Sequence, residues 1–189
     1  MPEPTPAGPL IALIGMPGGG KSTVGRHLAR RLALPFTDAD SVIESRIGMT
    51  IRAYFEAQGE DAFRDREQEV IAELAAAAPG VIATGGGAVL RESNRRVLRE
   101  RCTVVYLRST PEELARRLRH DTHRPLMQVA DPLARLRELY AQRHRLYEET
   151  ARFTVETGRP SVPTLVNMIL MQLELGGIVA PGGREPGPR

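Results

Sequence analysis

The residues whose types and spacing point most directly to chemistry form the segment GMPGGGKS at 15–22, immediately after the apolar run LIALI at 10–14. This segment fits the pattern G-x-x-x-x-G-K-[ST], with Gly15, Gly20, Lys21 and Ser22 at the specified positions. Glycines allow the backbone to curl with several N–H groups pointing inward, at a helix N-terminus that already favours anions. The segment therefore predicts a loop that holds the phosphates of a nucleotide. The alternative is a turn that is merely rich in glycine.

Lys21 supports the phosphate-binding interpretation because it is the only lysine among 26 basic residues. An ammonium group on a flexible stem reaches the β- and γ-phosphates of a nucleotide, whereas the planar fork of arginine is too bulky for such a loop. The hydroxyl of Ser22 suits Mg²⁺, which commonly accompanies bound phosphates. We therefore expect a nucleotide bound with magnesium at this loop.

Two carboxylates follow the second apolar run, in the segment FTDAD at 36–40. Ligands of open parallel sheets bind beyond the carboxyl ends of the strands, where Asp38 and Asp40 are expected. Because one residue separates them, one carboxylate could face the hydration shell of Mg²⁺ and the other a substrate hydroxyl. An equally good interpretation from the spacing is that Asp40 caps the helix that follows.

A second group of glycines, at 85–87, follows a further apolar run. Successive glycines after a buried strand indicate that bare backbone approaches another group closely. The alternative for these three residues is a flexible turn.

The elements that must position these residues alternate along the chain. Short, nearly continuous apolar runs are typical of parallel strands covered on both faces, and they are predicted at 10–14, 34–37, 81–84, 103–107 and 152–156. Helices are predicted at 21–32, 40–47, 51–58, 60–77, 93–100, 111–118, 132–150 and 163–175. This alternation favours a single α/β domain with a parallel sheet and right-handed crossovers.

Three segments fit no regular element. Residues 1–8 and 176–189 are dominated by proline and glycine, so we expect loose tails. The polar segment at 119–131 is interrupted by Pro125, and a loop of this length in a compact domain is either a functional lid or a plain solvent loop.

Composition argues against several classes of protein. The net charge is +3, but the arginines alternate with acids along the predicted helices and there is no tryptophan, so nucleic-acid binding is not expected. Cys102 is the only cysteine, which excludes an intrachain disulfide and a cysteine-rich zinc site. We find neither a signal peptide nor an apolar run of membrane-spanning length, and we expect a cytoplasmic protein without a membrane partner.

Six motifs extend this interpretation. They are GMPGGGKST at 15–23, DAD at 38–40, FRDRE at 63–67, GGG at 85–87, RPL at 124–126 and RHRLY at 143–147. In these motifs and their order, the chain resembles the shikimate kinase family, which has a nucleoside-monophosphate-kinase-like P-loop fold. The resemblance covers about residues 10–175. It implies a three-layer α/β sandwich with a five-stranded parallel sheet in the order 2-3-1-4-5, a mobile lid at 119–131 and a substrate-binding helical region at 40–78.

The resemblance also implies an activity: transfer of the γ-phosphoryl group of ATP to the 3-hydroxyl of shikimate, with Mg²⁺, by a monomer. Lys21, Asp40 and Arg124 would be catalytic, with Asp40 taking the proton of the attacking hydroxyl. Asp38 would hold magnesium through water, together with Ser22. ATP would contact Gly18, Gly19, Gly20, Lys21, Ser22, Thr23, Arg117, Arg124 and Arg159.

The acceptor would lie among residues from four parts of the chain. Arg64 and Arg143 would bind the shikimate carboxylate, and Glu67 would support Arg64. The whole set implied for the substrate is Asp40, Arg64, Gly85, Gly86, Gly87 and Arg143. Two alternatives remain: a kinase of another small hydroxylated metabolite such as gluconate, and a nucleotide-binding relative without catalysis.

Overall fold

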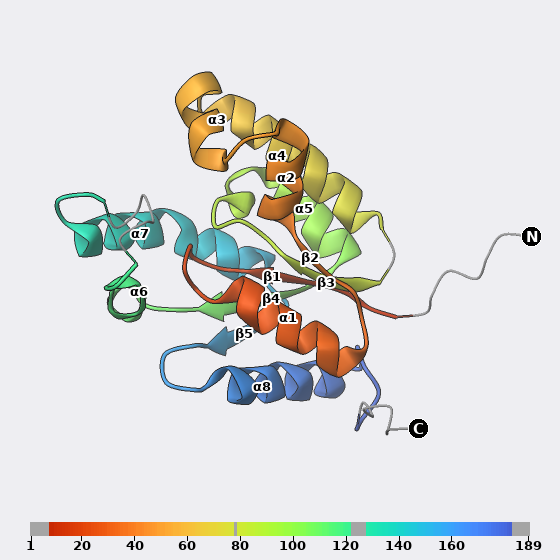
Figure 1. Cartoon of the computed structure of the whole chain (residues 1–189). Helices are drawn as coiled ribbons and strands as arrows, with labels where there is room; N and C mark the ends of the chain where they lie inside the picture. The colour runs from red at the N-terminus through yellow and green to blue at the C-terminus, as the bar shows by residue number, and fades with distance from the viewer. Residues whose placement is uncertain (1–7, 78, 122–127, 183–189) are drawn as a thin grey trace, which may run out of the picture.

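A parallel sheet forms the centre of the computed structural model, which describes residues 8–77, 79–121 and 128–182 (Figure 1). Its strands are β1 (Leu10–Ile14), β2 (Phe36–Asp38), β3 (Gly80–Ala83), β4 (Thr103–Arg108) and β5 (Phe153–Glu156). They lie in the order β2-β3-β1-β4-β5, and every neighbouring pair is parallel. The predicted fold and strand order are therefore confirmed.

Helices cover both faces of the sheet, which gives three layers (Figure 1). They are α1 (Lys21–Leu32), α2 (Ala39–Ile47), α3 (Ile51–Gln58), α4 (Glu60–Ala75), α5 (Glu92–Arg101), α6 (Pro111–Leu118), α7 (Pro132–Thr150) and α8 (Val162–Leu175). A short 3₁₀ helix, η1 (Ala88–Leu90), lies between β3 and α5 and was not predicted from the sequence. Within the described residues, no helix is long and apolar enough to cross a membrane.

Successive residues of the central strands enter different cores, because side chains alternate across a sheet. Ile11 and Leu13 pack in a cluster with α1 and α8, whereas Ala12 and Ile14 pack in a cluster with α5 and α7. A third, smaller cluster joins Ile43 of α2 to α4, with α3 packed against it. This cluster packs together the helices within 40–78, the region that the resemblance assigns to the substrate.

The second strand starts later than predicted, at Phe36 rather than residue 34. Ala33 ends α1 in the left-handed conformation with a φ of 53°, and the N–H of Leu34 donates back to Ala29 O over 2.9 Å. Pro35 has no N–H to donate and contributes only its carbonyl, which accepts from Val81 N–H over 2.9 Å, so the paired residues begin at Phe36. Similarly, α4 ends at Ala75 because the next two N–H groups form i→i−3 bonds that close its last turn.

Part of the segment expected as a C-terminal tail packs on the body of the protein. The N–H of Ile178 donates to Leu173 O over 2.8 Å, and Ile178 and Val179 pack against the cluster that α1 and α8 form with the sheet. The structure therefore extends the packed domain through at least Val179. Residues 1–7 and 183–189 of the predicted tails lie outside the described residues.

Candidate active site

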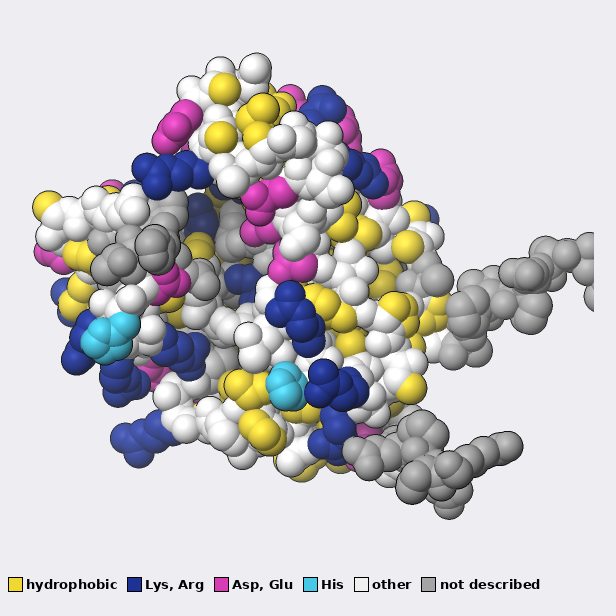
Figure 2. Space-filling model, viewed as in Figure 1, with side chains coloured by type: hydrophobic (Ala, Val, Ile, Leu, Met, Phe, Trp, Pro, Cys, Tyr) yellow, Lys and Arg dark blue, Asp and Glu magenta, His cyan; other side chains and the backbone are white. Residues whose placement is uncertain are grey.

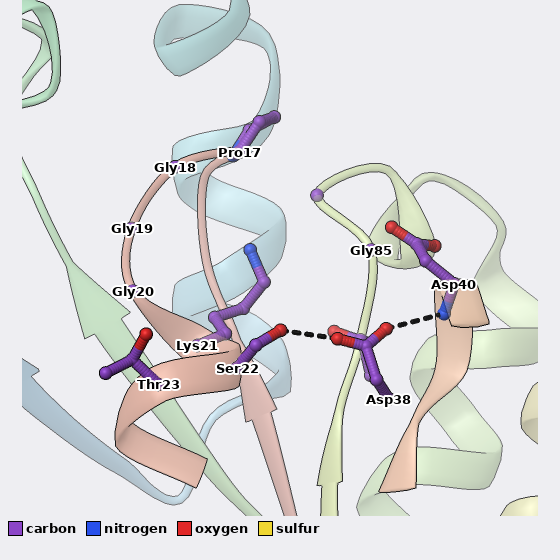
Figure 3. Close-up of a pocket in the computed structure, with 12 residues that line it drawn as sticks. Pro17, Gly18, Gly19, Gly20, Lys21, Ser22, Thr23, Asp38, Asp40 and Gly85 are labelled. Atoms are coloured by element: carbon purple, nitrogen blue, oxygen red, sulfur yellow. Dashed lines mark hydrogen bonds between the residues drawn. The ribbon is translucent and has the colours of Figure 1, made fainter. Parts of the chain in front are cut away.

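A pocket of about 220 Å³ opens at the carboxyl edge of the sheet, where β1, β2 and β3 end. It is lined by Pro17, Gly18, Gly19, Gly20, Lys21, Ser22, Thr23, Asp38, Asp40, Thr84, Gly85 and Gly86 (Figure 3). Figure 2 shows a hollow between the part of the molecule that carries α2–α4 and the part that carries α6 and α7, with charged side chains on its walls. The fold thus gathers three sequence motifs at one place.

The glycine-rich loop connects β1 to α1 and adopts a conformation that suits glycine. Gly18 and Gly20 have φ values of 77° and 84°, a region that side-chain-bearing residues rarely occupy. A Cβ on Gly18 would also lie 2.9 Å from Leu118 Cδ1 of α6. The loop ends at the N-terminus of α1, so its backbone provides the anion-binding geometry that the sequence predicts.

Lys21 is the first residue of α1, and its side chain turns back into the loop (Figure 3). Its Nζ donates to Gly15 O over 2.8 Å and to Met16 O over 2.9 Å, and only 9% of the residue is exposed. These bonds hold the ammonium group beneath the loop. A phosphate bound there would meet a positive charge shielded from water, where electrostatic attraction is stronger than at the surface.

Asp38 connects the loop to the second strand. The hydroxyl of Ser22 donates to Asp38 Oδ2, while Asp38 Oδ1 accepts from the N–H groups of Asp40 at 3.0 Å and Ser41 at 3.2 Å (Figure 3). The N-cap of α2 is therefore Asp38, which corrects the alternative in which Asp40 caps this helix. The Asp40 carboxylate remains available to the pocket.

The surroundings of Asp40 favour its neutral form. The pKa of Asp40 is raised from 3.8 to about 6: burial has the largest effect, the charges of Glu67 and Asp38 act in the same direction, and the charge of Lys21 opposes them. A Cβ on Gly85 would lie 2.7 Å from Asp40 Oδ1 and 3.2 Å from Glu67 Oε2. The missing side chain at Gly85 therefore makes room for two carboxylates at the end of β3.

Two arginines lie behind the glycine turn formed by residues 85–87. Arg64 Nη1 donates to Glu67 Oε1 over 2.7 Å, and a Cβ on Gly87 would lie 2.4 Å from the same guanidinium. Arg143 of α7 is close enough to Glu67 to lower its pKa, although burial has the larger effect and raises it. Both arginines are 9% exposed, and among the described residues neither Nε has a hydrogen-bond partner.

Three residues that the resemblance assigns to ATP are not among those lining this pocket. The Arg117 side chain is exposed and binds Ser109 Oγ over 3.4 Å as well as the carbonyl of Thr157. Arg159 is exposed in the turn after β5. Arg124 lies outside the described residues. Three residues that the resemblance assigns to the substrate, Arg64, Gly87 and Arg143, likewise do not line this pocket.

Sequence reasoning assigned no role to Pro17, Thr84 or Tyr147. Pro17 and Thr84 line the pocket, and position alone could have indicated them: one lies inside the glycine-rich loop and the other directly follows β3. Tyr147 is fully buried, and its hydroxyl donates to Gly86 O over 2.6 Å. No local pattern predicts that bond, because the partners are 61 residues apart.

Two residues at the N-terminus of α1 and the end of β2 are suited to binding Mg²⁺. Ser22 and Asp38 offer a hydroxyl and a carboxylate, the oxygen donors that this ion prefers, and they already contact each other. Among the described residues there is no group of three or more His, Cys, Asp or Glu that could hold a metal by itself. Few protein ligands are typical of Mg²⁺, which usually keeps several waters and shares phosphate oxygens.

Comparison with known proteins identifies the family. The family model described as "Shikimate kinase" matches residues 17–174. A shikimate kinase of Paracidovorax citrulli is 60% identical over 174 residues, covering 90% of this chain and 95% of that protein. One from Ralstonia nicotianae is 56% identical over 171 residues, covering 90% of each.

Solved structures agree with the sequence comparison. The structure of a shikimate kinase from Acinetobacter baumannii in complex with shikimate matches with a TM-score of 0.84 and 44% identity, covering 90% of this chain and 95% of that one. A gluconokinase from Sinorhizobium meliloti has a TM-score of 0.56 at 22% identity, a likeness of fold alone. The family model spans most of the chain and several relatives are more than half identical over 90% of it, so the chain belongs to the shikimate kinase family.

Proposed function

We propose that this protein transfers the γ-phosphoryl group of ATP to the 3-hydroxyl of shikimate, forming shikimate 3-phosphate and ADP. Family membership supports this activity, and so does the pocket. One side of the pocket is a loop suited to phosphates, and the other carries a carboxylate beside bare glycine backbone. The two sides together provide for a phosphate donor and a hydroxylated acceptor.

The observation that carries the proposal is the pair of buried arginines behind the glycine turn. Arg64 and Arg143 each keep an Nε without a hydrogen-bond partner among the described residues. Buried donors without partners are costly, so such a site favours an acceptor that brings oxygens of its own. Shikimate has one carboxylate, which arginine binds through two parallel hydrogen bonds, and three hydroxyls that glycine N–H groups can approach without steric hindrance.

In the proposed reaction, Asp40 takes the proton of the 3-hydroxyl as the acceptor oxygen attacks the γ-phosphorus. The O–H bond breaks, the new O–P bond forms, and the bond from the γ-phosphorus to the bridging oxygen breaks with its electrons passing to ADP. A pKa of about 6 suits this role, because Asp40 is then mostly ionised at pH 7 yet basic enough to accept the proton.

The phosphate side would act mainly by position and charge, since phosphoryl transfer needs little covalent chemistry from the protein. Lys21 and the N–H groups of the loop would neutralise charge on the transferred group. Ser22, and Asp38 through water, would hold Mg²⁺, which when bound offsets the negative charge of the phosphates. Arg124 would add positive charge from the segment at 119–131, a proposed lid, and Arg117 and Arg159 would border the adenine.

We also propose that the protein acts as a monomer in the cytoplasm, with ATP and shikimate as its partners and without nucleic acid. A single cysteine and arginines paired with acids on helix surfaces support this part of the proposal. No helix in the part of the chain that the structure describes could span a membrane.

A coupled assay of ADP release tests the activity, with ATP, Mg²⁺ and either shikimate or gluconate as acceptor. We expect turnover that depends on shikimate and exceeds the rate with gluconate, and ³¹P NMR of the product should show a phosphate ester at the 3-position. A faster reaction with gluconate would favour the alternative kinase. Nucleotide binding without turnover of either acceptor would favour a relative that lacks catalysis.

A further inference from the structure

Tyr147 connects helix α7 to the glycine turn of the acceptor site. Its ring is fully buried and stacks on Tyr106, with the ring centroids 5.0 Å apart. Its hydroxyl donates to Gly86 O over 2.6 Å, so the polar end of the side chain reaches the turn while the ring stays in the core. Burial raises the pKa of Tyr147 from 10 to about 12, so the hydroxyl remains a donor at neutral and at moderately alkaline pH.

Gly86 is held from its other side by the nucleotide loop. A Cβ at this position would lie 2.6 Å from both Cδ and Cγ of Pro17, so the backbone of Gly86 packs directly against the proline ring. The turn is therefore confined between the loop that faces the donor and the hydroxyl of Tyr147. Gly85 and Gly87, on either side, approach Asp40 and Arg64.

We propose that Tyr147 is a positioning residue for the acceptor: its hydroxyl holds the Gly86 carbonyl so that the turn at 85–87 keeps a fixed place relative to Asp40 and Arg64. The inference rests on the proposed function, since it concerns the site of the phosphoryl acceptor. Tyr147 also follows Arg143 by one helical turn on the same face of α7. One helix thereby provides both a charge for the acceptor and an anchor for the backbone beside it.

The segment that follows the turn has anchors of its own. Asn94 Nδ2 donates to Ala88 O over 3.0 Å, and Arg95 Nη1 donates to Val89 O over 2.7 Å. Loss of the Tyr147 hydroxyl should therefore loosen the turn at Gly86 without releasing η1. Tyr147→Phe makes this change while keeping the ring that packs against Tyr106.

Kinetics of Tyr147→Phe test the proposal, with Tyr106→Phe as the matched control. The control removes another tyrosine hydroxyl of the same stack, one that lies 3.4 Å from His144 Nδ1. We expect Tyr147→Phe to raise the KM for shikimate about 5- to 10-fold, as the loss of one hydrogen bond would, while the KM for ATP stays within about twofold of the wild type. The control should leave both constants near wild-type values.

Amide hydrogen exchange across 84–90, without ligands, provides a measurement that does not depend on turnover. Exchange in this segment should be faster in Tyr147→Phe than in the wild type, and unchanged in Tyr106→Phe. Unchanged exchange together with an unchanged KM for shikimate, or equal increases in both KM values, would overturn the positioning role. If the wild type fails to phosphorylate shikimate, the proposed function fails, and the exchange measurement alone decides the role of Tyr147.

Discussion

Asp38 and Asp40 stand two residues apart, and the fold gives them different surroundings. Asp38 accepts hydrogen bonds from the hydroxyl of Ser22 and from the N–H groups of Asp40 and Ser41 in the first turn of α2, and these donors stabilise its carboxylate. Asp40 faces the glycine turn beside Glu67, and burial raises its pKa to about 6. A difference of environment within one short motif thus distinguishes the carboxylate proposed to hold Mg²⁺ through water from the carboxylate proposed as the base.

Asp40→Asn should stabilise the protein at neutral pH while removing most of kcat. A carboxyl with a raised pKa holds its proton more tightly in the folded state, so its ionisation costs stability as pH rises from about 4 to 6, and the full cost remains above 6. We expect the variant to gain about 1–2 kcal/mol at pH 7.5, because the carboxylate is only partly shielded from water, and about half of that gain at pH 5.

Urea unfolding without nucleotide or Mg²⁺ measures this difference at the two pH values, and Glu149→Gln, at an exposed position of α7, serves as the control. Equal stability of the variant and the wild type at pH 7.5 would contradict the raised pKa of Asp40. Activity of Asp40→Asn within tenfold of the wild type would contradict its role as the base.

At the scale of elements, the site depends on where strands end and helices begin. The ends of β1, β2 and β3 lie side by side, so the nucleotide loop, the acidic pair and the glycine turn meet although they are far apart in sequence. Away from the site, α8 and the segment after it have a structural role: together with α1 they cover one apolar face of the sheet. Substitutions that disturb packing there should affect stability rather than the site.

Replacing Ile178 and Val179 with alanine should lower the stability of the domain. Both side chains pack, partly buried, against the cluster of α1 and α8, and their truncation removes apolar contacts. We expect a loss of about 1–2 kcal/mol, seen as a lower Tm by differential scanning calorimetry. Leu175→Ala, whose side chain is 80% exposed, should leave the Tm nearly unchanged. A similar Tm for the double variant and the control would show that the segment contributes no packing energy.

At the scale of the whole molecule, the sheet separates two cores and exposes one functional edge. The cluster with α1 and α8 and the cluster with α5 and α7 make β1 and β4 apolar on both faces. The smaller cluster of α2, α3 and α4 lies to one side and carries Arg64. Ligands that bind at the edge therefore contact parts of the chain that belong to different packing units, and their binding should stabilise the molecule as a whole.

Binding of Mg²⁺ and ADP should raise the Tm of the wild type. A ligand at 100 times its Kd adds about 2.7 kcal/mol to the free energy of unfolding, which corresponds to roughly 5–10 °C for a chain of this size. Lys21→Ala should lose most of this increase, because it removes the ammonium held beneath the loop. Arg30→Ala, exposed on α1, should retain it. An undiminished shift in Lys21→Ala would contradict the assignment of the loop to the phosphates.

The sequence alone determined the features that depend on local chemistry. Apolar runs and their alternation with helices predicted the sheet, and the spacing around Lys21 predicted the loop, because both follow from backbone geometry within a few residues. The element boundaries predicted from the sequence were less accurate where a contact ends an element, as at Ala33 and Pro35 before β2.

Only the tertiary structure decided which of several equivalent side chains reach the site. The sequence around the arginines does not distinguish them, but folding buries Arg64 and Arg143 and leaves Arg117 and Arg159 exposed. It likewise gave the helix cap to Asp38 rather than Asp40, and brought Tyr147 to Gly86 across 61 residues. The physical reason is that burial and hydrogen bonding are set by neighbours that the fold brings together, and no local spacing specifies those neighbours.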